Sequence, residues 1–232
     1  MLQDKLDQTR SEWRASLNPA DREVLLGSVE RLRMLQLAEH GLAVGDLLPE
    51  FTLPDFLGNL VSSEALLTQG PLVTAIVRGP WCPYCTLALD ALDQARPAIE
   101  QQGASLVVIS PVRREELQRA ADERGLRLQL LTDTDARYAR ICGVQYEMSE
   151  AHAELYRRLG WDVGRLNAGS GDELPVPATY VTAQDGVIAY AFADVDWTRR
   201  AEPADILEAV RHLTPARSEA GPPTVQGLGR PR

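Results

Sequence analysis

The sequence has little cysteine, almost no lysine and no long apolar run. Three cysteines in 232 residues are too few, and odd in number, for a secreted disulfide-bonded scaffold. No apolar run approaches the roughly 18 residues that a membrane-spanning helix needs. The first residues lack the basic and then apolar pattern of a signal peptide, so a cytoplasmic protein is expected.

Basic residues are outnumbered by acidic ones, so the formal net charge is −9, and Lys5 is the only lysine. A nucleic-acid-binding surface needs a basic patch, and an anionic membrane attracts basic segments. We therefore expect neither a nucleic acid nor a membrane as a partner. A hydrophobic share of 44% and a charged share of 25% are ordinary for a globular protein, which predicts a packed core.

The residue pattern divides the chain into three parts. Residues 1–43 are predicted to form a helical extension, because Asn18 before Pro19 is typical of a helix start. Residues 44–213 alternate apolar runs with helical patterns, which predicts an α/β domain. Residues 214–232 hold proline, glycine, serine and charge with almost nothing to bury, which predicts a disordered tail.

Within the central domain, short apolar runs bounded by turn residues predict the strands. They lie at 72–77, 104–110, 126–131, 178–182 and 187–191, the last two joined by a turn at Asp185-Gly186. The run at 72–77 has almost no polar residue and suits a central strand covered on both faces. A final helix is expected at 203–213 and an irregular loop at 160–175.

The segment Trp81-Cys82-Pro83-Tyr84-Cys85 stands between the first apolar run and a helical pattern. The start of a helix carries unpaired N–H groups and the positive end of the helix dipole, so a thiolate placed there is stabilised. Two intervening residues bring the second sulfur one turn further, within reach of a disulfide. Pro83 pre-sets the helical backbone angle. The motif predicts a redox-active thiol pair.

Two other interpretations of the cysteine pair remain open. Half of a zinc site would need two more ligands, and the candidates are scattered along the chain: Cys142, His40, His152 and His212. The pair could also be inert core cysteines. Neither a metal nor a cofactor is expected, and Cys142 is expected to be a buried free thiol or an alternative resolving thiol.

Two segments beside the cysteine motif resemble peroxiredoxins of the alkyl hydroperoxide reductase/thiol-specific antioxidant family. Val44-Gly45-Asp46-Leu47-Leu48-Pro49-Glu50-Phe51-Thr52-Leu53-Pro54-Asp55 is similar to the opening of these proteins, and Leu174-Pro175-Val176-Pro177-Ala178-Thr179-Tyr180-Val181 with Asp185-Gly186 to their closing hairpin. The resemblance implies a thioredoxin-like fold, a central mixed sheet flanked by helices. It also implies a thiol-dependent peroxide reductase with a thioredoxin- or glutathione-linked reductant.

The resemblance also implies roles for the cysteines. It places Cys85 at the peroxidatic position, Cys82 where the family has threonine or serine, and Arg78 where it has proline. The arginine that the family carries before its closing strand would fall near Val176 or Pro177, and it is absent there.

A different resemblance assigns the two thiols in the opposite order. Cys-Pro-Tyr-Cys is the glutaredoxin form of the motif, which makes Cys82 the exposed nucleophile and Cys85 the resolving thiol. Pro177 then looks like the cis-proline that faces the cysteine pair in thioredoxins and glutaredoxins. A thiol–disulfide oxidoreductase, or a redox sensor that is oxidised once without turnover, therefore stays open beside the peroxidase.

The remaining site residues are predicted from their place beside the pair. Trp81 is expected to shield the sulfurs, or to be a core residue, and Tyr84 to line the substrate pocket, or to face solvent. Arg78 is expected to lower a thiolate pKa by its charge, or to be a solvated arginine at a strand end. The amphipathic helix at 19–38 is compatible with a homodimer surface, and packing on the core would explain its apolar face equally well.

Overall fold

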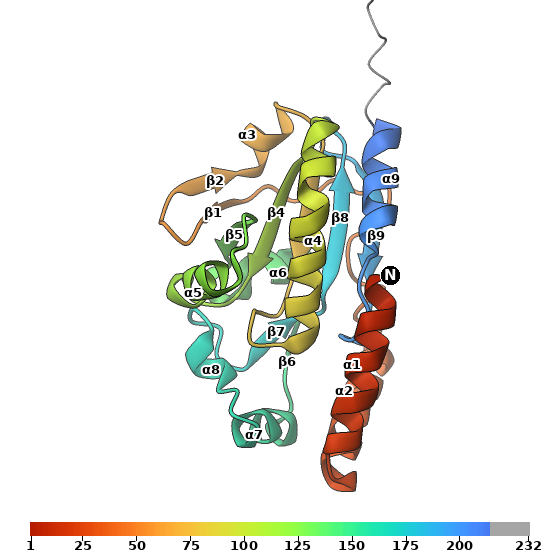
Figure 1. The fold of residues 1–232 in the computed structure, drawn as a ribbon, viewed down its shortest axis with the longest axis vertical. Helices are drawn as coiled ribbons and strands as arrows, with labels where there is room; N and C mark the ends of the chain where they lie inside the picture. Colours follow the sequence, from red (N-terminus) through yellow and green to blue (C-terminus); the bar gives the residue numbers. More distant parts are fainter. Residues whose placement is uncertain (214–232) are drawn as a thin grey trace, which may run out of the picture.

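The computed structural model describes residues 1–213, so the predicted tail lies outside the described residues. A sheet in the order β5-β4-β3-β8-β9 forms the centre (Figure 1). These strands are β3 (Leu72–Ile76), β4 (Ser105–Ser110), β5 (Gln129–Thr132), β8 (Ala178–Thr182) and β9 (Ile188–Ala193). β4 runs parallel to both β3 and β5, whereas β8 runs antiparallel to both β3 and β9. The predicted strands are confirmed.

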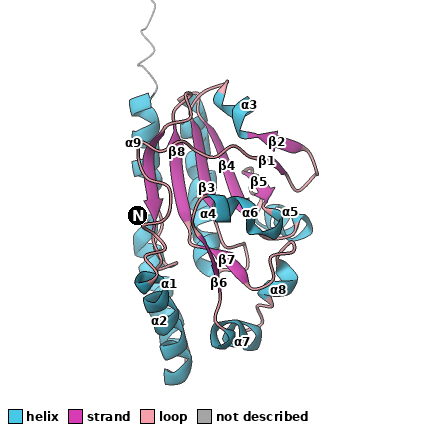
Figure 2. Ribbon diagram, turned by 180° about the vertical axis from the view of Figure 1, so that it is seen from behind, coloured by secondary structure: helices cyan, strands magenta, loops and turns pink. Residues whose placement is uncertain are grey.

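Helices cover both faces of this sheet. α4 (Pro83–Gln101) and α9 (Pro203–Leu213) pack side by side on one face (Figure 1), and α6 (Arg137–Ile141) lies on the other (Figure 2). α5 (Arg114–Arg124) packs against β5. Every residue of β3 is buried, as expected for a central strand covered on both sides.

The N-terminal extension is a pair of helices, α1 (Leu2–Ser16) and α2 (Pro19–Met34). The side chain of Asn18 caps α2 by accepting a hydrogen bond from the Asp21 N–H at 2.9 Å, which confirms the predicted helix start. α1 packs on α4, and α2 packs on α7 (Glu150–Arg158). The pair therefore stands beside the beginning of α4, where the cysteine motif lies (Figure 1).

The prediction of an irregular loop at 160–175 is wrong. This segment contains α8 (Val163–Leu166) and β7 (Glu173–Pro175), which pairs with β6 (Gln145–Glu147). The buried Asn167 side chain stabilises the turn before β7 by donating to the carbonyls of Gly171 and Glu173, each at 2.9 Å. The partner strand lies about 28 residues earlier, so no local pattern reveals it.

Smaller elements complete the described chain. A hairpin is formed by β1 (Thr52–Pro54) and β2 (Leu60–Ser62). It is followed by α3 (Ser63–Leu67) and, later in the chain, by the 3-10 turn η1 (Thr134–Ala136). Among the helices of residues 1–213, none is both long and apolar enough to cross a membrane.

The strand directions bring two distant loops together. β3 and β9 are both antiparallel to β8, so both strands end at the same edge of the sheet. The loop after β3, residues 77–82, therefore meets the loop after β9, residues 194–202. The cysteine motif begins in the first of these loops.

Candidate active site

The cysteine pair lies at the beginning of α4. Cys82 is the N-cap residue, Pro83 is the first helical residue, and Cys85 follows within the first turn. Both cysteines are free and buried, with exposed fractions of 2% and 0%. The hydroxyl of Thr86 donates to the carbonyls of Pro80 and Cys82, each at 3.0 Å, which fixes the turn that carries the pair.

Cys85 is the sulfur that carries negative charge. Burial raises the pKa of a thiol, but a hydrogen bond from Cys82 and the positive charges of Arg200 and Arg78 outweigh it, so the pKa of Cys85 lies well below its ordinary value. The Arg200 guanidinium donates to the Cys85 sulfur at 3.2 Å, and the backbone N–H of Gly79 adds a further donor. These groups therefore favour the thiolate form of Cys85.

Cys82 has the opposite character. Burial and the neighbouring charge on Cys85 raise the pKa of Cys82 well above its ordinary value, although Arg78 and Arg200 act against this shift. Two thiols in contact in a buried site cannot both ionise easily, so one proton is shared between them. The geometry assigns the thiolate to Cys85 and the proton to Cys82.

Arg78 is fully buried, so the alternative of a solvated strand-end arginine is wrong. Its guanidinium donates to the Tyr156 hydroxyl at 2.8 Å and lies over three rings, those of Trp81, Tyr156 and Trp197, at 4.8–5.3 Å from their centroids. No carboxylate among residues 1–213 forms an ion pair with it. A buried cation is costly without a counter-charge, and the charge of Arg78 helps to lower the pKa of Cys85, so a thiolate there would offset this cost.

His152 adds a neutral ring beside this cation. Its ring stacks on Trp197 with centroids 5.3 Å apart and meets Tyr156 edge-on at 4.3 Å. Burial and the charge of Arg78 lower the pKa of His152 to about 3, so the ring stays neutral at physiological pH. The site therefore contains two buried guanidiniums, one thiolate and an uncharged imidazole.

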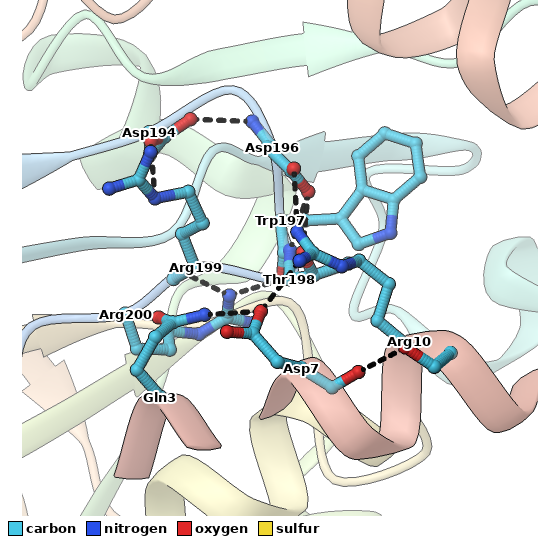
Figure 3. A network of polar contacts seen from close by, with 10 residues as sticks. Gln3, Asp7, Arg10, Asp194, Asp196, Trp197, Thr198, Arg199 and Arg200 are labelled. Atoms are coloured by element: carbon cyan, nitrogen blue, oxygen red, sulfur yellow. Dashed lines mark hydrogen bonds and ion pairs between the residues drawn. The ribbon is translucent and has the colours of Figure 1, made fainter. Parts of the chain in front are cut away.

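The loop after β9 holds Arg200 in place, and α1 braces this loop (Figure 3). Arg200 donates to the carbonyls of Trp197 and Arg199 as well as to the sulfur. Asp196 accepts from the Thr198 hydroxyl at 2.7 Å and faces Arg10 of α1 at 3.7 Å. The carboxylate of Glu202 caps the first turn of α1 through the Leu2 and Gln3 N–H groups. The N-terminal extension thus supports the loop that supplies the cation.

Gly79 allows the loop before the cysteines to pass close to its neighbours. Its φ is +146°, and a Cβ atom there would lie 2.5 Å from Trp81 Nε1 and 2.5 Å from Val112 Cγ2. No side chain fits in that space. A glycine is required because its backbone N–H must approach the Cys85 sulfur.

Trp81 and Tyr84 both lie inside the molecule. Trp81 is partly buried against Tyr156 and Trp161, with centroids 5.7 Å away in each case. Tyr84 is 1% exposed and meets Trp13 of α1 edge-on at 6.1 Å, so the alternative of a solvent-facing Tyr84 is wrong.

Pro177 lies beside the end of β3, since the β3–β8 register places it opposite Val77. Its peptide bond is trans, as is every other peptide bond of residues 1–213, so the expected cis-proline is wrong. The trans form is the lower-energy form of an X–Pro bond, and Pro177 lies between β7 and β8, directly before Ala178.

Cys142 and the histidines do not join the pair. Cys142 is buried beside Tyr138, and burial raises its pKa to about 12, as for an unreactive core thiol. Within the described part of the chain, no cluster of three or more histidine, cysteine or acidic side chains could hold a metal ion.

Arg200 and Tyr156 were not predicted as site residues, and His152 was named only as a scattered candidate zinc ligand. The signal for Arg200 was the run Trp197-Thr198-Arg199-Arg200 after the last strand, at the edge where the motif also begins. No sequence signal pointed to Tyr156 or His152, since α7 reaches the site only through its packing in the fold.

Comparisons with known proteins agree with this architecture. Residues 44–191 match the model of the AhpC/TSA family. The chain is 30% identical over 116 residues to the methylamine utilization protein MauD of Paracoccus denitrificans, covering 44% of this chain and 54% of MauD. The chain therefore spans about half the length of that relative.

Solved structures show the same fold at low identity. Peroxidoxin BcpB of Mycobacterium tuberculosis superposes with a TM-score of 0.58 and 21% identity, over 73% of this chain and 97% of BcpB. A putative thiol:disulfide interchange protein DsbE of Chlorobium tepidum gives 0.54 and 14%, over 75% and 99%. The predicted thioredoxin-like fold is confirmed by these neighbours.

Proposed function

This chain belongs to the AhpC/TSA family of peroxiredoxin-like proteins, and we propose that it reduces hydroperoxides with Cys85 as the attacking thiolate. One observation carries the proposal, namely the hydrogen bond from Arg200 to the Cys85 sulfur in a site with a second buried guanidinium. Such a site stabilises a thiolate and also the negative charge that develops on a peroxide oxygen. The family's arginine near Val176 is absent, and Arg200 supplies that charge from another loop.

The reaction consumes one peroxide and oxidises two thiols. The Cys85 thiolate attacks the terminal peroxide oxygen, the O–O bond breaks, and the alkoxide leaves and takes up a proton. Cys85 is then a sulfenic acid. The Cys82 sulfur attacks the Cys85 sulfur, the S–O bond breaks, and water leaves with the Cys82 proton. An external dithiol returns two electrons and two protons by thiol–disulfide exchange.

The raised pKa of Cys82 suits its part in this order of events. As a thiol it donates a hydrogen bond to the Cys85 thiolate, and it becomes the resolving group once Cys85 is oxidised. A thioredoxin- or glutathione-linked dithiol is the proposed reductant, and the cytoplasm is the proposed compartment.

A thiol–disulfide oxidoreductase is the second candidate, favoured by the position of Cys82 at the N-cap of α4. In that mechanism Cys82 would attack a substrate disulfide and Cys85 would release the product. The distribution of charge works against it, because the raised pKa of Cys82 leaves that sulfur protonated.

Single-cysteine variants test the proposal with excess thioredoxin or glutathione reducing system. We expect wild type and the control Cys142→Ser to consume peroxide steadily, and Cys85→Ser to be inactive. Assayed without added thiol, Cys82→Ser should complete one stoichiometric turnover and leave a sulfenic acid that dimedone traps. If wild type reduces disulfides but not peroxide, and Cys82→Ser abolishes that activity, the second candidate is correct. A single oxidation without turnover would indicate a redox sensor.

A further inference from the structure

A cleft opens between the N-terminal helix pair and the loop after β9, directly above the first turn of α4. Its apolar wall is formed by Trp13, Leu25, Val29 and Trp197. Tyr84 lines the same cleft and stands between the two cysteines in the sequence. A ligand in this cleft would therefore lie one side chain away from the thiol pair.

Tyr84 presents an unpartnered polar group to this cleft. The residue is 1% exposed, and its hydroxyl has no hydrogen-bond partner within residues 1–213. A buried hydroxyl without a partner is costly, and native proteins pair nearly all such groups. Tyr84 thus lines a mainly apolar cleft and carries a buried hydroxyl that no residue of 1–213 satisfies.

Two cations at the cleft have no acidic partner. Arg14 of α1 and Arg22 of α2 both line it, and neither forms an ion pair with another residue in the described range. The acidic residue of the cleft, Asp196, is already engaged by Thr198 and Arg10. Arg22 donates only to the Ala15 carbonyl, at 3.3 Å. The cleft therefore combines an apolar wall, an unsatisfied tyrosine hydroxyl and two exposed guanidiniums without a carboxylate partner.

We propose that this cleft binds a small amphipathic carboxylate, a molecule with a short alkyl or aryl body and an anionic head. The body packs between Trp13, Leu25 and Trp197. The carboxylate pairs with Arg14 and Arg22 and accepts a hydrogen bond from the Tyr84 hydroxyl. Arginine suits this role because its planar donors match the two oxygens of a carboxylate.

Neither part of such a ligand would suffice alone. Surface arginines bind simple anions weakly in water, and a small apolar wall gives little selectivity. Together they recognise a tail and a charge at a fixed separation. The binding site is independent of peroxide reduction, and the proposal makes no statement about turnover.

Octanoate is the probe for the test, with acetate as the charge without the tail and 1-octanol as the tail without the charge. Binding to full-length reduced protein is followed by tryptophan fluorescence, because Trp13 and Trp197 line the cleft. We expect saturable binding of octanoate, and binding weaker by about tenfold or more for both other probes. 1-Octanol loses the charge-assisted hydrogen bonds, and acetate loses the burial of the apolar tail.

Variants locate the site. The double variant Arg14→Gln/Arg22→Gln should weaken octanoate binding by about tenfold, and Tyr84→Phe should weaken it several-fold. Binding of 1-octanol should change little in either variant. Arg31→Gln, an exposed arginine of α2 away from the cleft lining, is the matched control and should bind as wild type does. Equal octanoate affinity in the double variant, or no saturable binding in wild type, would overturn the proposal. So would a concentration-dependent dimer that the double variant abolishes, since a second copy would then occupy the cleft.

Discussion

Arg200 donates a hydrogen bond from its guanidinium to the sulfur of Cys85 at 3.2 Å, although 115 residues separate them in the chain. The contact joins the loop after β9 to the first turn of α4. It also sets which of the two buried sulfurs is ionised, because the cation lies on Cys85.

Arg200→Met should raise the pKa of Cys85, since it removes a neighbouring positive charge that favours the thiolate. The measurement is the pH dependence of iodoacetamide alkylation at Cys85, resolved by peptide mass spectrometry. Arg199→Met is the matched control, because Arg199 is 57% exposed and pairs with Asp194 instead. If the midpoint of the Cys85 alkylation–pH curve is the same in Arg200→Met as in wild type, Arg200 does not stabilise the thiolate.

Arg78→Met should separate the electrostatic role of Arg78 from its packing role. Replacing a buried cation by an apolar side chain of similar length costs little, so we expect the free energy of unfolding to stay within about 2 kcal/mol of wild type. Arg78→Ala loses the same charge and also leaves a cavity among the three rings, so it should cost about 3 kcal/mol or more.

Both Arg78 variants should show an increased Cys85 pKa, because both lose the same charge. Urea unfolding and the alkylation profile are measured on each protein. Equal destabilisation in Arg78→Met and Arg78→Ala would mean that the charge itself stabilises the fold.

Local patterns in the sequence were sufficient to predict most elements and the cysteine motif. The Asn18 cap, the apolar run of β3 and the Cys82–Cys85 spacing each depend on residues close together in the chain, so their physical meaning is visible without the fold. The predictions of a cis-proline at Pro177 and of an irregular loop at 160–175 were wrong. Both features depend on how a segment packs against distant parts of the chain.

The charged part of the site could not be predicted in the same way. Arg78 stands at a strand end, a position that is solvated in many proteins, and it is buried here only because α7 and the loop after β9 close over it. Tyr156 and Arg200 come from segments about 80 and 120 residues further along the chain. The meeting of the β3 and β9 ends at one edge of the sheet brings Arg200 to the site, and the packing of α7 brings Tyr156.

His152→Phe should make the protein less sensitive to acid. The pKa of His152 is about 3 in the folded protein and about 6.5 in an unfolded chain. Above pH 6.5 the imidazole is neutral in both the folded and the unfolded protein, so His152 does not contribute to the pH dependence of stability there. As the pH falls below 6.5, the unfolded chain binds a proton that the folded protein does not, and stability is lost progressively until about pH 3.

Between pH 7.5 and pH 5, this loss is on the order of 2 kcal/mol for His152. Phenylalanine keeps the ring contacts and cannot titrate, so urea unfolding at the two pH values should show a smaller loss by about that amount. His212→Gln is the control, because His212 is 78% exposed. Identical losses in wild type and His152→Phe would show that the imidazole is protonated in the folded protein.

Trp13→Ala should make the cysteine pair accessible to large reagents. Trp13 of α1 packs on Tyr84 at 6.1 Å and on Trp161 at 5.9 Å, so it is the main aromatic contact that holds α1 over the first turn of α4. Truncating a buried tryptophan costs about 3–5 kcal/mol, and less for one that is only partly buried. Weaker docking of α1 raises the population of a locally open state.

Labelling of the cysteine pair by a maleimide–polyethylene glycol reagent should then be faster by about tenfold or more, since 1.4 kcal/mol already changes a population tenfold. Met34→Ala, at an exposed position at the end of α2, should label at the wild-type rate. Amide exchange in β3 distinguishes local opening from global unfolding, because β3 should stay protected in Trp13→Ala. If the labelling rate does not change while α1 loses its protection, access to the sulfurs runs through another face, and the N-terminal helices support Arg200 without covering the thiols.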